Sequence, residues 1–138
     1  MLNPVNTAIS FVLLIAVVGA SFVYVSGKPV EIVEPWLGIT GSTITPEIVV
    51  ELGLTHDQGF LIVCVEPSSP AANAGLKVDD IITEVDGNEV ITRNDIAEVL
   101  QQKHIGESIN FKIVRGTEQP RDVPLTLVDK PDRVSCTT

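Results

Sequence analysis

The sequence predicts one small α+β domain, a barrel or sandwich of roughly five to six strands with two to three helices, preceded by one transmembrane helix. Two observations support this prediction. The 9 Lys and Arg and the 18 Asp and Glu all lie in residues 28–138, whereas residues 1–27 hold no charged side chain. Within the charged stretch, short β-rich runs alternate with capped helix patterns, and its length suits one hydrophobic core.

The charge balance disfavours several kinds of function. A net charge of −9 argues against nucleic acid as a partner, because phosphate binding requires a concentrated basic face. The 2 cysteines and 2 histidines are far apart in the sequence and do not match the spacing of a zinc site. We therefore expect no nucleic acid partner, no metal and no cofactor.

An apolar run covers residues 8–25, and a helix of that length would span about 27 Å, close to the hydrocarbon thickness of a bilayer. We expect residues 1–27 to be a retained single-pass anchor in membrane lipid. A cleaved signal peptide is the alternative, which the length of the run and the absence of Lys or Arg before it disfavour. Small residues on one helix face would let other membrane subunits pack there.

The first half of the charged stretch predicts a linker, a strand, a helix and a second strand. Residues 28–35 form an extended linker, and residues 36–40 read as a strand. A capping threonine followed by proline and glutamate begins a helix over residues 45–52, and Gly53 ends it. The uninterrupted β-rich run at residues 60–65 predicts a strand buried on both faces.

The second half predicts three more strands and two helices. A Ser-Ser-Pro sequence begins a helix of one to two turns within residues 68–75, and residues 80–85 form a strand that ends in an Asp-Gly turn. The strongest helix pattern covers residues 92–103. Alternating apolar residues predict a strand at 108–115, which pairs with an edge strand at 123–128 that a proline interrupts.

Residues 67–90, PSSPAANAGLKVDDIITEVDGNEV, closely resemble the centre of the PDZ domains of HtrA-type serine proteases. The aromatic-apolar-Gly-apolar sequence at residues 36–39 is similar to the loop of that family. The resemblance extends over residues 36–128 and implies a PDZ domain at 36–129, followed by a loose tail at 130–138.

The resemblance implies that the domain binds C-termini or extended segments of other proteins by adding them as a strand. The backbone N–H groups of Leu37, Gly38 and Ile39 would hold the ligand carboxylate, and a large side chain at Gly38 should block ligand without harming the fold. The apolar residues have a second interpretation as ordinary core. The expected groove residues are Trp36, Thr40, Gly41, Ile96, Val99 and Leu100, with one or two of the last three forming the pocket.

The sequence departs from the family at two points. Many PDZ domains place a basic residue shortly before the loop, where this chain has Glu31 and Glu34. A ligand carboxylate is repelled there unless its upstream residues are basic or the two glutamates point away. Asp79 replaces the family's glycine, and an aspartate there has to adopt a left-handed backbone.

Catalytic chemistry finds no support in the sequence. The chain has neither a Gly-x-Ser-x-Gly nor a His-Glu-x-x-His motif, and a linker stands where HtrA-type proteins carry their protease domain. Asp79, Asp80 and Asp86 could form a site of paired acids, but turn and capping roles explain them better. We expect Cys64 to be a small core residue and Cys136 to lie in the loose tail, with no disulfide between them.

The sequence therefore predicts a membrane-anchored, non-enzymatic PDZ protein that binds protein C-termini. The alternative is an accessory structural subunit of a larger membrane complex, in which the helix packs against other subunits and the PDZ-like domain is a cap. Lys28 is the only charged residue flanking the apolar run, so the positive-inside rule does not fix the orientation. We expect the domain to be extracytoplasmic.

Overall fold

The computed structural model describes residues 23–25, 28–30 and 35–136. The chain divides into two compact units, residues 1–33 and 34–138, and each is described by itself.

The first unit contains an antiparallel strand pair, β1 (Val23–Val25) and β2 (Lys28–Val30). The expected helix at 8–25 is therefore wrong at its C-terminal end, because its last three residues form β1. The remaining part of that prediction, residues 8–22, lies outside the described residues. No helix among the described residues is long and apolar enough to cross a bilayer.

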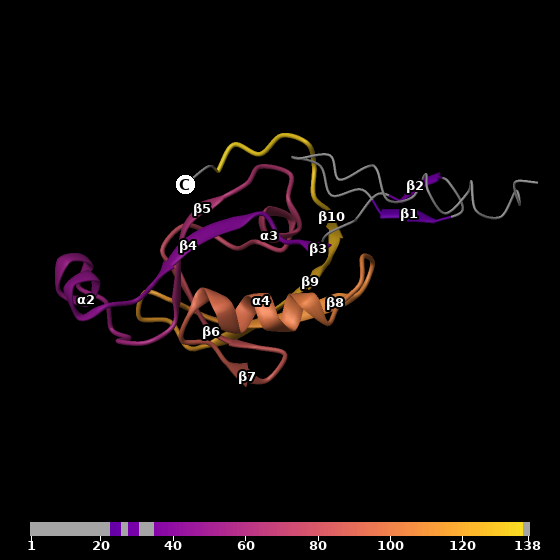
Figure 1. Ribbon diagram of the computed structural model, residues 1–138. Coiled ribbons are helices and arrows are strands. Elements are labelled where there is room, and N and C mark those ends of the chain that lie inside the picture. The colour runs from indigo at the N-terminus through magenta and orange to yellow at the C-terminus, as the bar shows by residue number, and fades with distance from the viewer. Residues whose placement is uncertain (1–22, 26–27, 31–34, 137–138) are drawn as a thin grey trace, which may run out of the picture. The chain divides into compact units, whose positions relative to one another are not determined.

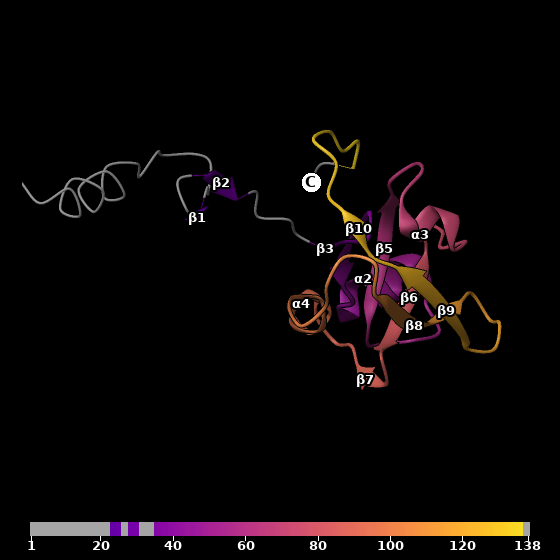
Figure 2. The same ribbon diagram turned by 90° about the vertical axis from the view of Figure 1, so that its right-hand side faces the viewer.

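The second unit is built on an antiparallel sheet in the order β4-β5-β6-β8-β9, with β7 paired to β6, and a short pair, β3 with β10 (Figure 1). The sheet strands are β4 (Ile39–Thr43), β5 (Phe60–Val65), β6 (Asp80–Val85), β7 (Asn88–Glu89), β8 (Ser108–Arg115) and β9 (Arg121–Thr126). The short pair is β3 (Pro35–Trp36) with β10 (Val128–Asp129). The helices are α2 (Pro46–Leu52), α3 (Pro70–Asn73) and α4 (Arg93–Gln101), and α3 and α4 lie on opposite sides of the strands in Figure 2.

Local capping explains where the helices begin and end. The Thr45 hydroxyl accepts the Ile48 N–H at the start of α2, and Gly53 ends the helix with a φ of 62°. At α4 the Asp95 carboxylate accepts the Thr92 N–H at 2.7 Å, which fixes the N-terminus of the helix. This bond and a second one from the Ile91 N–H lower the pKa of Asp95.

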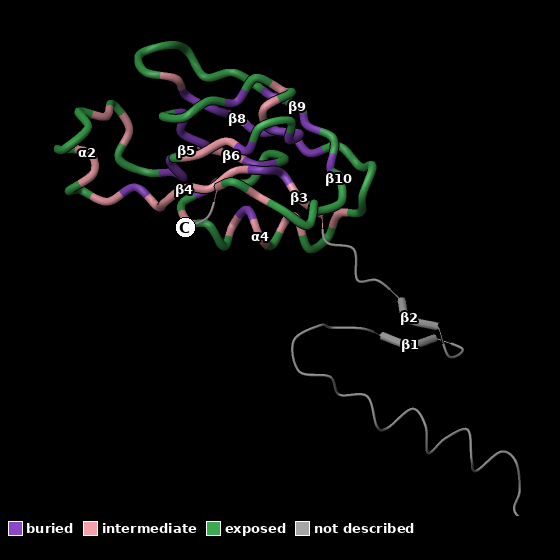
Figure 3. Tube along the Cα trace, turned by 90° about the horizontal axis from the view of Figure 1, so that it is seen from above, coloured by how far each residue is buried: buried purple, intermediate pink, exposed green. Residues whose placement is uncertain are grey.

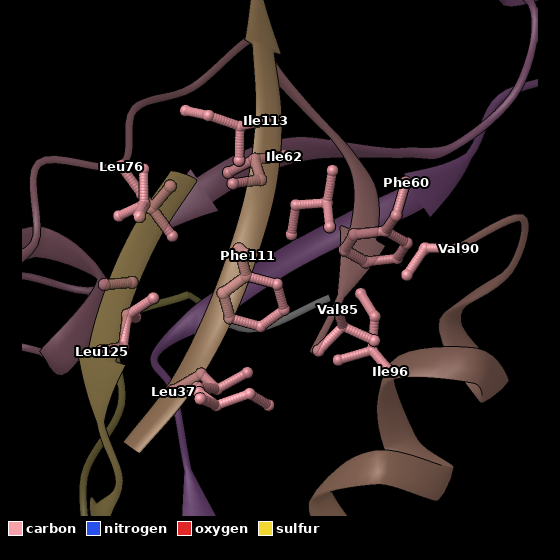
Figure 4. Close-up of a cluster of buried hydrophobic side chains, with 14 of the residues drawn as sticks. Leu37, Phe60, Ile62, Leu76, Val85, Val90, Ile96, Phe111, Ile113 and Leu125 are labelled. Carbon is pink, nitrogen blue, oxygen red and sulfur yellow. The ribbon is translucent and has the colours of Figure 1, made fainter. Parts of the chain in front are cut away.

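The core lies inside the curved sheet, beneath α3 and α4. Figure 4 shows Phe111 at its centre, and Figure 3 shows buried residues concentrated along β6 and β8. Leu37, 4% exposed, and Ile96, 5% exposed, both belong to this core.

Asp80 is a charged residue in the interior, and its side chain is fully buried. Its carboxylate accepts two bonds from the Arg115 guanidinium, at 2.6 and 2.7 Å, and one from the Lys77 N–H at 2.9 Å. These bonds satisfy both carboxylate oxygens. The preceding residue, Asp79, has a φ of 73°, so the expected left-handed backbone is confirmed.

Three strand predictions need correction. The expected strand at 123–128 is divided, because β9 ends at Thr126 and Val128 begins β10, which pairs with β3 instead of β8. The expected strand at 36–40 is interrupted, because Leu37 and Gly38 form a loop between β3 and β4. The strand at 60–65 has the expected bounds but is fully buried only at its first three residues, and Val63 is 49% exposed. The reason is that β6 pairs only with Phe60 and Leu61, so among the described strands the second half of β5 has a neighbour on one side alone.

Candidate functional site

The loop between β3 and β4 is held by its carbonyl groups. The Leu37 carbonyl accepts the Ala71 N–H at 3.1 Å, and the Gly38 carbonyl accepts the Glu66 N–H at 2.7 Å. Because a trans peptide is planar, the N–H of each following residue points the opposite way from the carbonyl. The N–H groups of Gly38 and Ile39 therefore face away from α3 and β5.

The strand that follows the loop has an open edge. β4 is the first strand of the sheet, and among the described residues it pairs on one side only, with β5. Alternate N–H and C=O groups along its other side are therefore free to accept an added strand. A cavity of about 430 Å³ lies along this edge. It is lined by Trp36, Gly38, Ile39, Thr40, Gly41, Phe60, Glu66, Arg93, Lys130, Val134 and Cys136.

The nine predicted site residues separate into two groups in the structure. Five of them line the cavity: Trp36, Gly38, Ile39, Thr40 and Gly41. The other four do not: Leu37, Ile96, Val99 and Leu100. Leu37 and Ile96 are core residues, and Val99 and Leu100 pack against the core. Val99 also lines a separate hollow beside β7.

Helix α4 contributes its first residue, Arg93, to the cavity. The apolar pattern that singled out Ile96, Val99 and Leu100 marked the face of the helix that packs against the core. Arg93 was missed because a single exposed arginine carries no periodic signal.

Neither of the two glycines in the cavity wall has room for a side chain. A Cβ at Gly38, where φ is +81°, would lie 2.2 Å from the Ser69 Cβ, and one at Gly41 would lie 2.1 Å from the Leu61 carbonyl oxygen. The expectation that a large side chain at Gly38 would block ligand without harming the fold is therefore wrong, since even a methyl group collides with Ser69.

The C-terminal tail is attached to the domain, which corrects two predictions. Cys64 and Cys136 form a disulfide, and residues 130–136 are not a loose end. Cys64 lies in the half of β5 that lacks a second neighbour, so its side chain is only partly buried and is accessible to the tail. The sequence led to the opposite expectation because the apolar run at 60–65 suggested burial throughout.

Glu66 makes a second attachment for the tail. Its carboxylate oxygens accept the Ser135 N–H at 2.6 Å and the Cys136 N–H at 2.7 Å. These bonds, the one from Cys136 first, lower the pKa of Glu66. The Thr40 hydroxyl adds a bond to the Cys136 carbonyl at 3.3 Å, so the tail is tied to β4 as well as to β5.

The cavity has a cationic character. Arg93 and Lys130 both line it, and among residues 35–136 neither has a carboxylate within ion-pair distance. Among the described residues of the lining Glu66 is the one acidic residue, and its oxygens accept the Ser135 and Cys136 N–H groups of the tail. Glu31 and Glu34, the predicted source of repulsion, lie outside the described residues. Within the described part of the chain, no group of three or more His, Cys, Asp or Glu residues gathers as a metal site.

The described fold is a small curved sheet with β4 at one end, a loop between β3 and β4 whose residues Gly38 and Ile39 line a cavity, and helix α4, which contributes Arg93 to the same cavity. The family model described as "PDZ domain" matches residues 35–124. The chain belongs to the PDZ domain family.

Curated relatives and solved structures agree with this assignment. The putative serine protease HhoB of Synechocystis sp. is 43% identical over 90 residues, which cover 59% of this chain and 22% of that protein. A probable periplasmic serine endoprotease, DegP-like, of Halomonas elongata is 33% identical over 97 residues, 70% of this chain and 20% of that protein. The chain thus spans about a fifth of the length of these relatives, and the match covers their PDZ part.

Two solved structures share the fold. "HtrA-type protease AlgW with decapeptide" matches with a TM-score of 0.68 and 24% identity, over 78% of this chain and 32% of that chain. "Crystal Structure of the HtrA3 PDZ Domain Bound to a Phage-Derived Ligand (FGRWV)" matches with a TM-score of 0.59 and 23% identity, over 72% of this chain and 88% of that chain. Together with the family model and the curated relatives, these matches relate the domain to the PDZ domains of HtrA and DegP proteases.

Proposed function

We propose that this protein is a membrane-anchored, non-enzymatic PDZ protein that binds the C-termini of partner proteins by strand addition. The observation that supports this most strongly is the orientation of the Gly38 and Ile39 N–H groups, which face away from the bonds that hold the loop. Two successive N–H groups at the start of a strand edge are a suitable site for a terminal carboxylate.

The rest of the ligand would lie antiparallel to β4. Its main chain would bond to the free edge of that strand, and its last side chain would lie against the apolar surface of Ile39 and Phe60 in the cavity. The two solved relatives carry a decapeptide and a phage-derived peptide ligand, which supports peptide binding for the same fold.

The membrane and extracytoplasmic parts of the proposal have separate support. The apolar sequence before β1 suits a bilayer, although a span that ends by Phe22 has to begin upstream of Ala8 to cross roughly 30 Å of hydrocarbon. A structural disulfide between Cys64 and Cys136 suits an oxidising compartment, and a relative's name places it in the periplasm.

The test compares peptides that differ only at the C-terminus. The full chain, kept in a mild non-ionic detergent, is titrated into fluorescein-labelled octapeptides ending in valine, one with a free carboxylate and one amidated, and binding is followed by fluorescence polarisation. We expect the free acid to bind at least about tenfold more tightly, because charge-assisted bonds to the loop are lost on amidation. Equal affinity for the two peptides would refute carboxylate capture.

Mass spectrometry of the same samples tests the non-enzymatic part of the proposal. The peptides should remain intact after prolonged incubation, and time-dependent cleavage that follows the protein concentration would show that the chain is an enzyme.

A further inference from the structure

We infer that the groove selects C-termini with an acidic side chain two to four residues before an apolar last residue, and that tail residues 130–136 form its outer wall. This inference rests on the proposed function and names the ligand class for the same site.

The direction of α4 relative to β4 determines which part of a ligand meets Arg93. The N–H of Gly106, in the loop after α4, donates to the Leu127 carbonyl. Val128 follows Leu127 and pairs with Trp36, which directly precedes the loop between β3 and β4, here called the carboxylate loop. The C-terminal end of α4 therefore lies near that loop, and its N-terminal end lies toward the Thr43 end of β4 (Figure 1).

Arg93 is the first residue of α4, so it lines the part of the cavity that is distant from the carboxylate loop. A ligand strand antiparallel to β4 rises roughly 3.3 Å per residue away from the loop. The nine-residue helix covers about 13 Å. The Arg93 guanidinium would consequently meet side chains two to four residues before the end of the ligand.

Lys130 provides the second cation, near the other end of the groove. It follows Asp129, whose Cα is paired with that of Pro35 just before the carboxylate loop. The terminal carboxylate would thus have a basic residue nearby, supplied by the tail instead of by the segment before the loop. The two cations together favour anionic ligands, which disfavours the alternative that basic upstream ligand residues offset Glu31 and Glu34.

The tail is attached to the domain at both ends, so it can form a fixed outer wall of the groove. Its far end is fixed by the disulfide and by the bonds from Ser135 and Cys136 to Glu66, and its near end follows β10. In Figure 1 the yellow tail runs from β10 toward β5. Lys130, Val134 and Cys136 face the same cavity as β4, so a ligand would contact them directly.

The experiment uses the full chain and two labelled octapeptides with a free C-terminal valine, one carrying Glu and the other Lys three residues before the valine. At low salt we expect the Glu peptide to bind about five- to tenfold more tightly, with the difference shrinking as salt is added. Arg93→Glu should abolish or reverse this preference. Lys77→Glu makes the same change in net charge outside the cavity and should leave the preference intact.

The outcomes separate this inference from the proposed function. If both peptides bind with equal affinity and amidation still weakens their binding, the selection for an acidic side chain is wrong and C-terminal binding stands. If neither free-acid peptide binds, both proposals fail. If Lys77→Glu removes the preference as fully as Arg93→Glu, the effect is one of net charge and the assignment to Arg93 is wrong.

The wall is tested by releasing the tail. Cys136→Ser should weaken the binding of both peptides about three- to tenfold. The ratio of the two affinities should be unchanged, because Arg93 belongs to the helix and stays in place. Val134→Ala, which keeps the disulfide, should weaken both peptides by a smaller factor and remains informative if Cys136→Ser does not fold. Tighter binding in either variant would show that the tail covers the groove, which would overturn its role as a wall.

Discussion

The two halves of β5 have nearly the same apolar character and very different surroundings. Phe60, Leu61 and Ile62 are buried, and the first two pair with β6 as well as with β4. In the described part of the chain, β4 is the only strand beside Val63, Cys64 and Val65, which are exposed or partly buried. The comparison shows that an apolar run becomes core only where a second layer or strand covers it. The uncovered half is instead used to hold the tail.

The largest expected effect is in the covered half. Ile62 is fully buried, so Ile62→Ala should lower the free energy of unfolding by about 2–5 kcal/mol, since it removes buried methyl groups and leaves a cavity. Val63→Ala is the matched control on the uncovered half and should cost about 0.5 kcal/mol or less. Urea unfolding measures both. Similar costs at the two positions would contradict the comparison.

The disulfide should be the next largest contribution. It joins residues 72 apart in sequence, and reducing it should lower the free energy of unfolding by about 2–4 kcal/mol through the entropy of the unfolded chain. Thermal unfolding with and without a dithiol reductant measures this. A Cys64→Ser variant should match the reduced protein and should not respond further to reductant. An unchanged melting temperature on verified reduction would show that the tail is not fixed by this bond.

A smaller loss is expected at the loop that begins the groove. Gly38→Ala should cost about 2 kcal/mol, because its Cβ would collide with Ser69 and its backbone is left-handed. Gly53→Ala is the control with a similar backbone and open space around the Cβ, so it should cost only about 1 kcal/mol. Equal losses in chemical denaturation would mean that the close approach to Ser69 is unimportant.

The attachment through Glu66 should depend on pH. Its folded pKa lies below the usual value of 4.5, so the stabilisation is fully present above that value and is lost as the pH falls through the folded pKa. Glu66→Gln should weaken this acid dependence. The measurement is hydrogen exchange at the Ser135 and Cys136 amides from pH 6 down to pH 3. Protection that does not change with pH in the parent chain would contradict the role of Glu66.

The smallest predicted effect is a gain in stability. Asp79 has a φ of 73°, which glycine adopts without strain, so Asp79→Gly should raise the free energy of unfolding by about 0.5 kcal/mol. Lys77→Gly, outside the left-handed positions, is expected to be destabilising when measured in parallel. Loss of stability in Asp79→Gly would show that the aspartate side chain has a role beyond the backbone turn.

Local signals made much of the fold predictable from sequence. The caps of α2 at Thr45 and Gly53 and the bounds of β6 and β8 follow from residues within a few positions of one another, and the structure confirms them. The break between β3 and β4 was not predictable in this way. It depends on bonds from the loop to Glu66 and Ala71, which come from later parts of the chain.

The site was predictable only where backbone conformation defines it. The glycine loop and the edge of β4 could be placed from their motif, and five of the nine predicted residues line the cavity. Arg93 and Lys130 could not, because an exposed cation has no sequence pattern that links it to a groove. The pairing of Cys64 with Cys136 depends on which half of β5 is uncovered, and that is a property of the assembled sheet.

The most direct test of C-terminal peptide binding is to observe the loop amides themselves. In the ¹⁵N-labelled full chain, a saturating amount of the free-acid peptide should shift the Gly38 and Ile39 amide proton resonances downfield, as expected for N–H groups that donate to a carboxylate. The amidated peptide should leave these two resonances nearly in place. Binding of the free-acid peptide without any shift of the Gly38 and Ile39 amides would contradict the proposal that this loop captures the carboxylate.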